Sequence, residues 1–155
     1  MANKILWDAN PSADVIMAAV GGALRDLVDD GIAVSDEVTN GTDLNTMASL
    51  ELYVHDFAAA PDSGAYFEAH IVYQLDGTNY ADGEDGDLAE PNLSAATEVG
   101  VFPIVASDVD QRVQIVGIPI EPFDFKVCVI NRSGQAIPDT DNSKLTIWTY
   151  AAEVQ

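Results

Sequence analysis

Apolar and polar residues alternate most clearly along residues 66–75. Apolar side chains recur at every second position from Phe67 to Leu75, and Glu68 and His70 stand between them. A period of two is typical of a half-buried β-strand. Five more stretches have strand-like patterns bounded by turn residues. The six predicted strands are residues 49–57, 65–75, 98–106, 111–120, 123–131 and 143–150.

The spacing of these strands predicts a mainly β fold. Short turns separate them without the helical crossovers of a βαβ unit, so an antiparallel sandwich or barrel is expected. The connection AAAPDSG predicts a hairpin between 49–57 and 66–75. Pro103 lacks an N–H, so its strand should be an edge strand or carry a bulge. The expected inner face comprises Leu50, Leu52, Phe67, Ile71, Phe123, Phe125 and Val127.

The N-terminal third is ambiguous. Between residues 12 and 30, pairs of apolar residues recur every four positions, which predicts one short amphipathic helix beginning at Ser12 and ending near Gly31. Gly21 and Gly22 oppose it, since each glycine costs about 1 kcal/mol against alanine in a helix interior. A strand or a broken element is the alternative. Residues 35–47 are predicted to form a loop.

A length of 155 residues suits one domain. We expect residues 1–11 to form an N-terminal arm and residues 12–155 a single β-sandwich domain. The arm carries Ile5, Leu6 and Trp7. Because burial of such a side chain gains roughly 1.5–3 kcal/mol, these three are candidate interface residues. They are expected to dock on a sheet edge, an adjacent subunit or a larger shell.

The chain is strongly acidic. Six Lys and Arg against 26 Asp and Glu give a formal net charge of −20. Such a charge repels nucleic acid and anionic membranes, so neither is expected as a partner. It suits solubility, a basic partner or bound cations. No apolar run approaches the roughly 18 residues of a membrane span, and the first residues make a poor secretory signal. Cys128, the one cysteine, is expected to be a buried, unreactive thiol.

Catalytic and metal signatures are weak. The chain has neither a Gly-x-Ser-x-Gly motif nor a phosphate-binding glycine loop, so no catalytic residue, no cofactor and no enzymatic activity are predicted. His55 and His70 would lie side by side on paired strands and either hold a metal or be simple neighbours; the second interpretation is preferred. The acidic loop Asp76–Asp87 is interpreted as a solvated turn, with calcium binding as the alternative.

Aromatic residues are frequent in the predicted strands. They could form a sugar-stacking patch, or fill the core and interfaces, as strands favour aromatic residues in any case. The six residues are Tyr53, Tyr66, Tyr73, Tyr80, Trp148 and Tyr150.

Three motifs, in this order and spacing, resemble a known group. They are DGTNYADG at 76–83, VGVFPI at 99–104 and the run from Val116 to Ile137, followed by NSKLTIWTY. Together they resemble small virion structural proteins of tailed bacteriophages over about residues 43–150. The resemblance implies a jelly-roll-like β-sandwich assembled on the phage particle, and it carries over no catalytic residue.

The function expected from this resemblance is capsid decoration. A decoration, or cement, protein binds the outer surface of the head and stabilises it, so the expected location is the capsid surface of the virion. The expected partners are the major capsid protein and further copies of the chain, as a homotrimer. The alternative is a tail- or fibre-associated adhesion module that binds host glycan. A depolymerase or hydrolase fragment is the third hypothesis.

Overall fold

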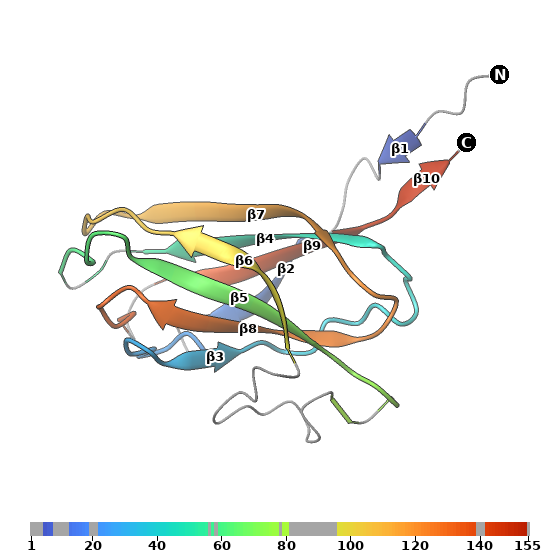
Figure 1. Ribbon diagram of the computed structural model, residues 1–155, viewed down its shortest axis with the longest axis horizontal. Coiled ribbons are helices and arrows are strands. Elements are labelled where there is room, and N and C mark those ends of the chain that lie inside the picture. The colour runs from blue at the N-terminus through green and yellow to red at the C-terminus, as the bar shows by residue number, and fades with distance from the viewer. Residues whose placement is uncertain are drawn as a thin grey trace.

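The computed structural model describes residues 5–7, 13–18, 22–55, 57, 59–77, 79–80, 96–138 and 142–154. Within these ranges the chain contains only strands, turns and bends (Figure 1). No helix capable of spanning a membrane occurs in them. The strands are β1 (Ile5–Trp7), β2 (Ala13–Ala18), β3 (Ile32–Val34), β4 (Met47–Val54), β5 (Tyr66–Tyr73), β6 (Thr97–Pro103), β7 (Gln111–Pro119), β8 (Phe125–Arg132), β9 (Lys144–Tyr150) and β10 (Ala152–Val154).

Eight of these strands form two four-stranded antiparallel sheets. One sheet has the order β2-β9-β4-β7 and the other β3-β8-β5-β6. Strands that follow one another in the sequence often lie in different sheets, as in β2/β3, β4/β5, β6/β7 and β8/β9. The chain therefore crosses the sandwich repeatedly. An eight-strand double sheet with this winding is a jelly roll. The predicted jelly-roll-like β-sandwich is therefore confirmed.

The core lies between the two sheets and follows from the alternation. In β4 every second side chain is buried, from Ala48 to Val54. Six of the seven residues predicted for the inner face are fully buried; they are Leu50, Leu52, Phe67, Ile71, Phe125 and Val127. Phe123 was wrongly included, because it is 50% exposed. It lies in the bend before β8, where the strand alternation has not yet begun.

The predicted helix near the N-terminus is wrong in the described residues. Residues 13–18 form β2, and a turn follows from Gly22. A β-bulge between Val15 and Met17 shifts the register, so the consecutive residues Ile16 and Met17 are both buried. The bulge and the buried turn that follows it each place apolar residues close together in the sequence. Their spacing therefore resembles the four-residue repeat of an amphipathic helix. At Gly22 an added Cβ would lie 2.5 Å from the Ala18 carbonyl oxygen, so the close chain reversal needs glycine.

The predicted hairpin between residues 49–57 and 66–75 is also wrong. β4 pairs with β7 and β9, whereas β5 pairs with β6 and β8 in the opposite sheet. The connection between β4 and β5 thus crosses the sandwich. Pro103 ends β6, an edge strand, as expected from its missing N–H. The strands β3 and β10 were not predicted, because three residues are too few to show alternation.

Candidate functional site

The segment with the candidate interface residues Ile5, Leu6 and Trp7 forms strand β1. It pairs antiparallel with β10, so that Ile5 is opposite Val154 and Trp7 is opposite Ala152. The two strands make a separate two-stranded sheet, here called the ribbon, which stands off from the sandwich (Figure 1). The side chains of these three residues lie outside the described part of the structure, so their role as interface residues stays a prediction.

The outer face of the β2-β9-β4-β7 sheet gathers three of the six aromatic residues singled out in the sequence. Tyr53 on β4 and Trp148 and Tyr150 on β9 point away from the core, because their neighbours in each strand point into it. All three are partly exposed. We call this surface the aromatic face. The phenol oxygen of Tyr150 lies 3.3 Å from Ser49 Oγ on β4.

Polar side chains on β4 and β7 connect across the aromatic face. Glu51 accepts hydrogen bonds from Arg112 Nη1 at 2.7 Å and from Gln114 Nε2 at 2.9 Å. The Arg112 guanidinium lies 4.3 Å from the centre of the Tyr53 ring, which is a cation–π contact. Each Glu51 oxygen therefore has a partner within the chain. The sequence did not predict this group, because the β4–β7 pairing joins residues about 60 positions apart in the chain.

His55 lies just after β4, at one end of the same sheet. Its Nδ1 is 2.7 Å from Asp110 Oδ1, and the Tyr53 hydroxyl donates to Asp110 Oδ2 at 2.8 Å. The His55 backbone N–H donates to Ser143 Oγ at 3.0 Å. These contacts tie the end of β4 to the turns that precede β7 and β9.

His70 lies on the outer side of the opposite sheet, beside Cys128. The expected side-by-side arrangement of His55 and His70 is therefore wrong. His70 is 7% exposed, and neither ring nitrogen has a hydrogen-bond partner; Nε2 is 3.5 Å from Glu68 Oε2. No cluster of three or more His, Cys, Asp or Glu suited to a metal occurs among the described residues. Cys128 is completely buried, as predicted, and its low reactivity stays a prediction.

The acidic loop is described only at its start. The two carboxylate oxygens of Asp76 accept hydrogen bonds from the backbone N–H and the side-chain amide of Asn79, both at 2.7 Å. Tyr80 is buried and donates to Glu37 Oε2 at 2.5 Å. Burial and the nearby Glu37 carboxylate raise the pKa of Tyr80. Residues 81–87 hold the remaining acidic residues of the loop and lie outside the described residues. The solvated turn and its alternative, a calcium site, therefore both stay predictions.

A shallow groove of about 330 Å³ lies over β5 and β6, lined by Tyr66, Glu68, Glu98 and Val101. Arg132 Nε donates to Glu68 at 3.2 Å, and Arg132 also pairs with Asp30. The hydrogen bond to Asp30 is the main reason why the pKa of Arg132 is raised. One carboxylate of this groove is therefore already neutralised by the chain's own arginine.

Comparison with known proteins identifies no family. No family model matches the chain, and no curated sequence matches it significantly. Among solved structures, it is similar to the CBM36-1 domain of a multidomain xylanase from the hindgut metagenome of Trinervitermes trinervoides, with 8% identity, 96% of this chain and 94% of that chain covered, and a TM-score of 0.40.

Two further solved structures are similar over nearly the whole chain. One is the C-terminal domain of a chitobiase from Bacteroides fragilis, with 13% identity, 99% and 95% of the chains covered and a TM-score of 0.30. The other is a family two carbohydrate esterase from Cellvibrio japonicus, with 12% identity, 99% of this chain but 35% of that chain covered and a TM-score of 0.29. These scores are too low to transfer any function to this chain.

Proposed function

We propose that this chain is a capsid decoration protein of a tailed bacteriophage, which binds the outer surface of the head and stabilises it. The observation that carries the proposal is the ribbon. It joins β1 to β10 outside the two sheets and stands off from a sandwich that already has its own core (Figure 1). An appendage of this kind suits a domain that must connect neighbouring subunits on a lattice.

The sequence and its charge support the same role. The three motifs within residues 76–137, taken in their order along the chain, resemble those of virion structural proteins of tailed phages. Copies that each carry a formal charge of −20 repel one another, so association on a shell needs local contacts that outweigh this repulsion. The apolar triplet Ile5-Leu6-Trp7 of the ribbon is a suitable contact. Many weak contacts around a shell add up, because each bound copy raises the effective concentration of the next.

The test is binding of the purified chain to undecorated heads of the phage that encodes it. We expect saturation at a copy number proportional to that of the major capsid protein, and heads that resist heat better when they are saturated. Binding confined to tails, or at a small multiple of the tail symmetry, would contradict the proposal. Heads that bind the chain without any gain in heat resistance would contradict the stabilising role.

The second candidate is an adhesion module of the tail or fibre that binds host glycan, and the aromatic face favours it. Tyr53, Trp148 and Tyr150 offer rings on which a sugar could stack. The carboxylate of Glu51 and the Tyr53 hydroxyl are already hydrogen-bonded within the chain, so stacking would have to supply most of the binding energy.

Titration with neutral oligosaccharides, followed by isothermal calorimetry, tests this second candidate. Binding that is lost in Trp148→Ala but kept in Tyr66→Ala would support it, because Tyr66 lies on the opposite sheet. No binding heat with any neutral oligosaccharide at millimolar concentration would remove the aromatic face from consideration as a glycan site.

A further inference from the structure

An exposed leucine with a strained backbone lies at one end of the sandwich. Leu44 is 56% exposed and has a φ of +53°. The other non-glycine residues with a positive φ in the described chain are Asp26 and Asp30, and aspartate tolerates this left-handed conformation better than leucine does. Strained positions of this kind are frequent at functional sites. Because Leu44 is not buried in the core of its own chain, a contact with another molecule would account for a leucine here.

The loop that carries Leu44 connects the ends of both sheets. The Asn40 N–H donates to Asp124 Oδ1 at 2.6 Å, directly before β8 in one sheet. The Ile120 N–H donates to the Thr46 carbonyl at 3.1 Å, directly after β7 in the other sheet. The loop is therefore held on both sides, and the fold itself presents Leu44 to solvent.

Two more exposed apolar side chains lie where β5 ends and β8 begins. Tyr73 pairs with Phe125 at this end of the β5–β8 ladder, and the centres of their rings are 5.9 Å apart. Leu75 and Phe123 each lie two positions beyond this pair and are 67% and 50% exposed. With Leu44, they give this end of the sandwich three large apolar side chains that are open to solvent.

The ribbon leaves the sandwich from the same end. Met47, the first residue of β4, pairs with Pro119 near the end of β7 and with Tyr150 at the end of β9. β10 follows β9 after one residue, so the ribbon continues outward from here (Figure 1). We call this part of the sandwich the ribbon end; it comprises residues 40–46, 74–77 and 119–124. The exposed apolar side chains and the ribbon therefore lie close enough to serve one contact.

The charge of the ribbon end favours a basic partner. Its three segments contain four acidic residues and no Lys, Arg or His. The four are Asp43, Asp76, Glu121 and Asp124. Arg112, Arg132 and Lys144 lie instead in the strand pairs at the opposite end. A basic surface would be attracted to the ribbon end by its charge.

A second copy of the chain suits the ribbon end less well. Two ribbon ends would bring like charges together. The opposite end offers Arg112 and Arg132, but both already form ion pairs with carboxylates of their own chain. The charges of the described residues therefore favour a different, basic protein as the occupant.

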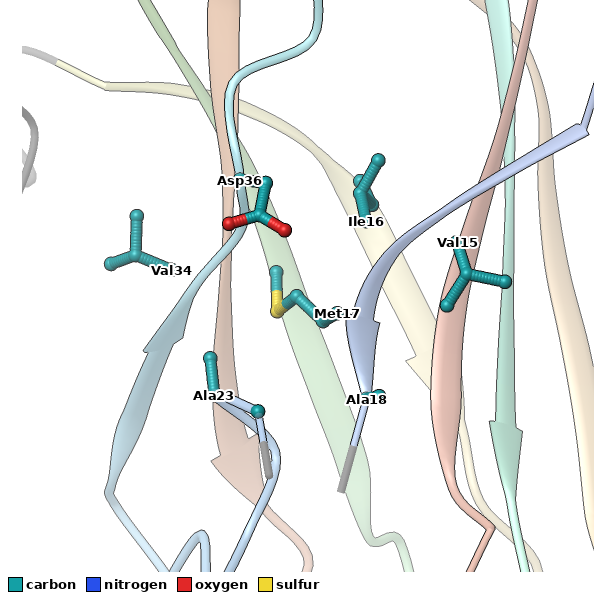
Figure 2. A pocket seen from close by; sticks show the side chains of 8 residues that line it. Val15, Ile16, Met17, Ala18, Ala23, Val34 and Asp36 are labelled. Carbon is teal, nitrogen blue, oxygen red and sulfur yellow. The ribbon is translucent and has the colours of Figure 1, made fainter. Parts of the chain in front are cut away.

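The opening between the edge strands β2 and β3 does not offer a comparable surface. Ile16 and Met17 line it, but both are almost fully buried in the core. Figure 2 shows this opening, with the carboxylate of Asp36 among the groups that line it. Its largest apolar side chains are covered by the chain itself, unlike those of the ribbon end.

We propose that the ribbon end is a contact surface for a protein whose exposed apolar groups are surrounded by Lys and Arg, and that this protein is the outer surface of the phage head. Leu44, Leu75 and Phe123 pack against the apolar groups, and the carboxylates around them face the bases. This inference rests on the proposed decoration role for the identity of the partner. It adds a second point of attachment beside the ribbon, and two linked contacts bind more tightly than either alone.

Leu44→Asn separates this contact from folding. In co-sedimentation with undecorated heads, the variant should show a dissociation constant raised about tenfold. Its midpoint of urea unfolding should stay the same or rise, because asparagine adopts the left-handed conformation more readily. Val105→Asn is the matched control, an exposed apolar side chain in the turn between β6 and β7 at the opposite end, and it should bind as the intact chain does. A lowered midpoint in Leu44→Asn would place Leu44 in the core of its own chain and overturn the contact.

Asp43→Lys tests the charge of the partner. The substitution should weaken binding to heads, because a lysine there would face bases. Asp108→Lys changes the net charge by the same amount in the exposed turn between β6 and β7, so it should have a much smaller effect. Added salt should weaken the binding of the intact chain, because it screens the attraction. Binding by Asp43→Lys that equals or exceeds that of Asp108→Lys would overturn the basic partner.

The outcomes separate this inference from the proposed function. Heads that bind the intact chain, Leu44→Asn and Asp43→Lys equally would overturn the contact and leave the decoration role standing. Heads that do not bind the intact chain would contradict both. Self-association in sedimentation velocity that is weakened by Leu44→Asn would assign the ribbon end to a second copy and overturn the proposed partner.

Discussion

The sandwich and the ribbon are both built from antiparallel strands, yet only the sandwich is shown to be stabilised by a buried core. Between the sheets, Leu50, Phe67 and Phe125 are completely buried. The ribbon consists of β1 and β10, three residues each, and the described residues add no third strand to it. An isolated two-stranded ribbon is at best marginally stable in water. The sandwich therefore has its own core, whereas the ribbon is the part that a contact with another subunit would stabilise most.

This difference separates folding from assembly. Substitutions in the core or in the loops that close the sandwich should change the free energy of unfolding. Substitutions in β1 should leave it almost unchanged and act on association. The predictions below follow that order, from the largest expected change in the free energy of unfolding to the smallest.

Phe67→Ala should have the largest effect. Phe67 is 0% exposed at the centre of the core, so removing its ring leaves a cavity and should lower the free energy of unfolding by about 3–5 kcal/mol. Urea unfolding followed by circular dichroism measures this change. A loss below about 1 kcal/mol would contradict the view that one tightly packed core between the sheets holds the domain.

Asn131→Ala should cause the next largest change in the free energy of unfolding. Asn131 is completely buried; its Nδ2 donates to the carbonyls of Leu27 and Gln135, and its Oδ1 accepts from the Ser133 N–H. Its removal takes three hydrogen bonds and leaves the buried Ser133 N–H without this acceptor, which should cost about 1–3 kcal/mol. The Leu27 and Gln135 carbonyls keep one donor each, the Ile137 N–H and the Ser133 hydroxyl. The same urea measurement tests it, with Val105→Ala, an exposed position, as the control. Equal stability of the two variants would contradict the account.

The sequence predicted most of the sandwich because most of its strands are long. Alternation over seven to nine residues located β4 to β9 within a few positions. It did not predict their partners, because a strand pattern records which side is buried and not which strand lies beside it. β4 and β5 were therefore expected in one hairpin although they face each other across the core. A bulge in β2 gave that strand a helix-like spacing of apolar residues, so a helix was predicted there.

The candidate sites were less predictable for the same reason. The contact of Glu51 with Arg112 and the contact of Tyr53 with Asp110 both join residues that are far apart in the sequence. Glu51 carries no local signal that distinguishes it from the other acidic residues of a chain with 26 of them. The ribbon triplet could be singled out, because an apolar run inside a short polar segment is visible without any knowledge of the fold.

Tyr80→Phe should change how stability depends on alkaline pH. Burial raises the pKa of Tyr80 in the folded chain above its unfolded value of about 10. Above pH 10 the unfolded chain therefore loses this proton while the folded chain keeps it, so stability falls by about 1.4 kcal/mol per pH unit for this group. The stability contributed by this group is fully present below pH 10.

Urea unfolding between pH 8 and pH 11 measures this slope. Phenylalanine cannot titrate, so the variant should lose stability less steeply above pH 10, while the two proteins keep parallel curves below it. Curves that stay parallel across the whole range would show that Tyr80 does not hold its proton in the folded state.

The ribbon should give the smallest change in stability. Replacing Ile5, Leu6 and Trp7 together by serine should alter the free energy of unfolding by no more than about 0.5 kcal/mol, as for substitutions away from a packed core. Urea unfolding of the variant under the conditions used for the core variants provides the comparison. A cost of several kcal/mol would place the triplet in the core of its own chain and would end the distinction between sandwich and ribbon.

The central claim is that the ribbon attaches this chain to other subunits without holding its fold. The most direct measurement is co-sedimentation of the folded triple-serine variant and the intact chain with undecorated heads, at matched and limiting protein concentration. The account predicts that the intact chain decorates the heads and that the variant, although folded, stays largely in the supernatant. Heads decorated as fully by the variant as by the intact chain would contradict it.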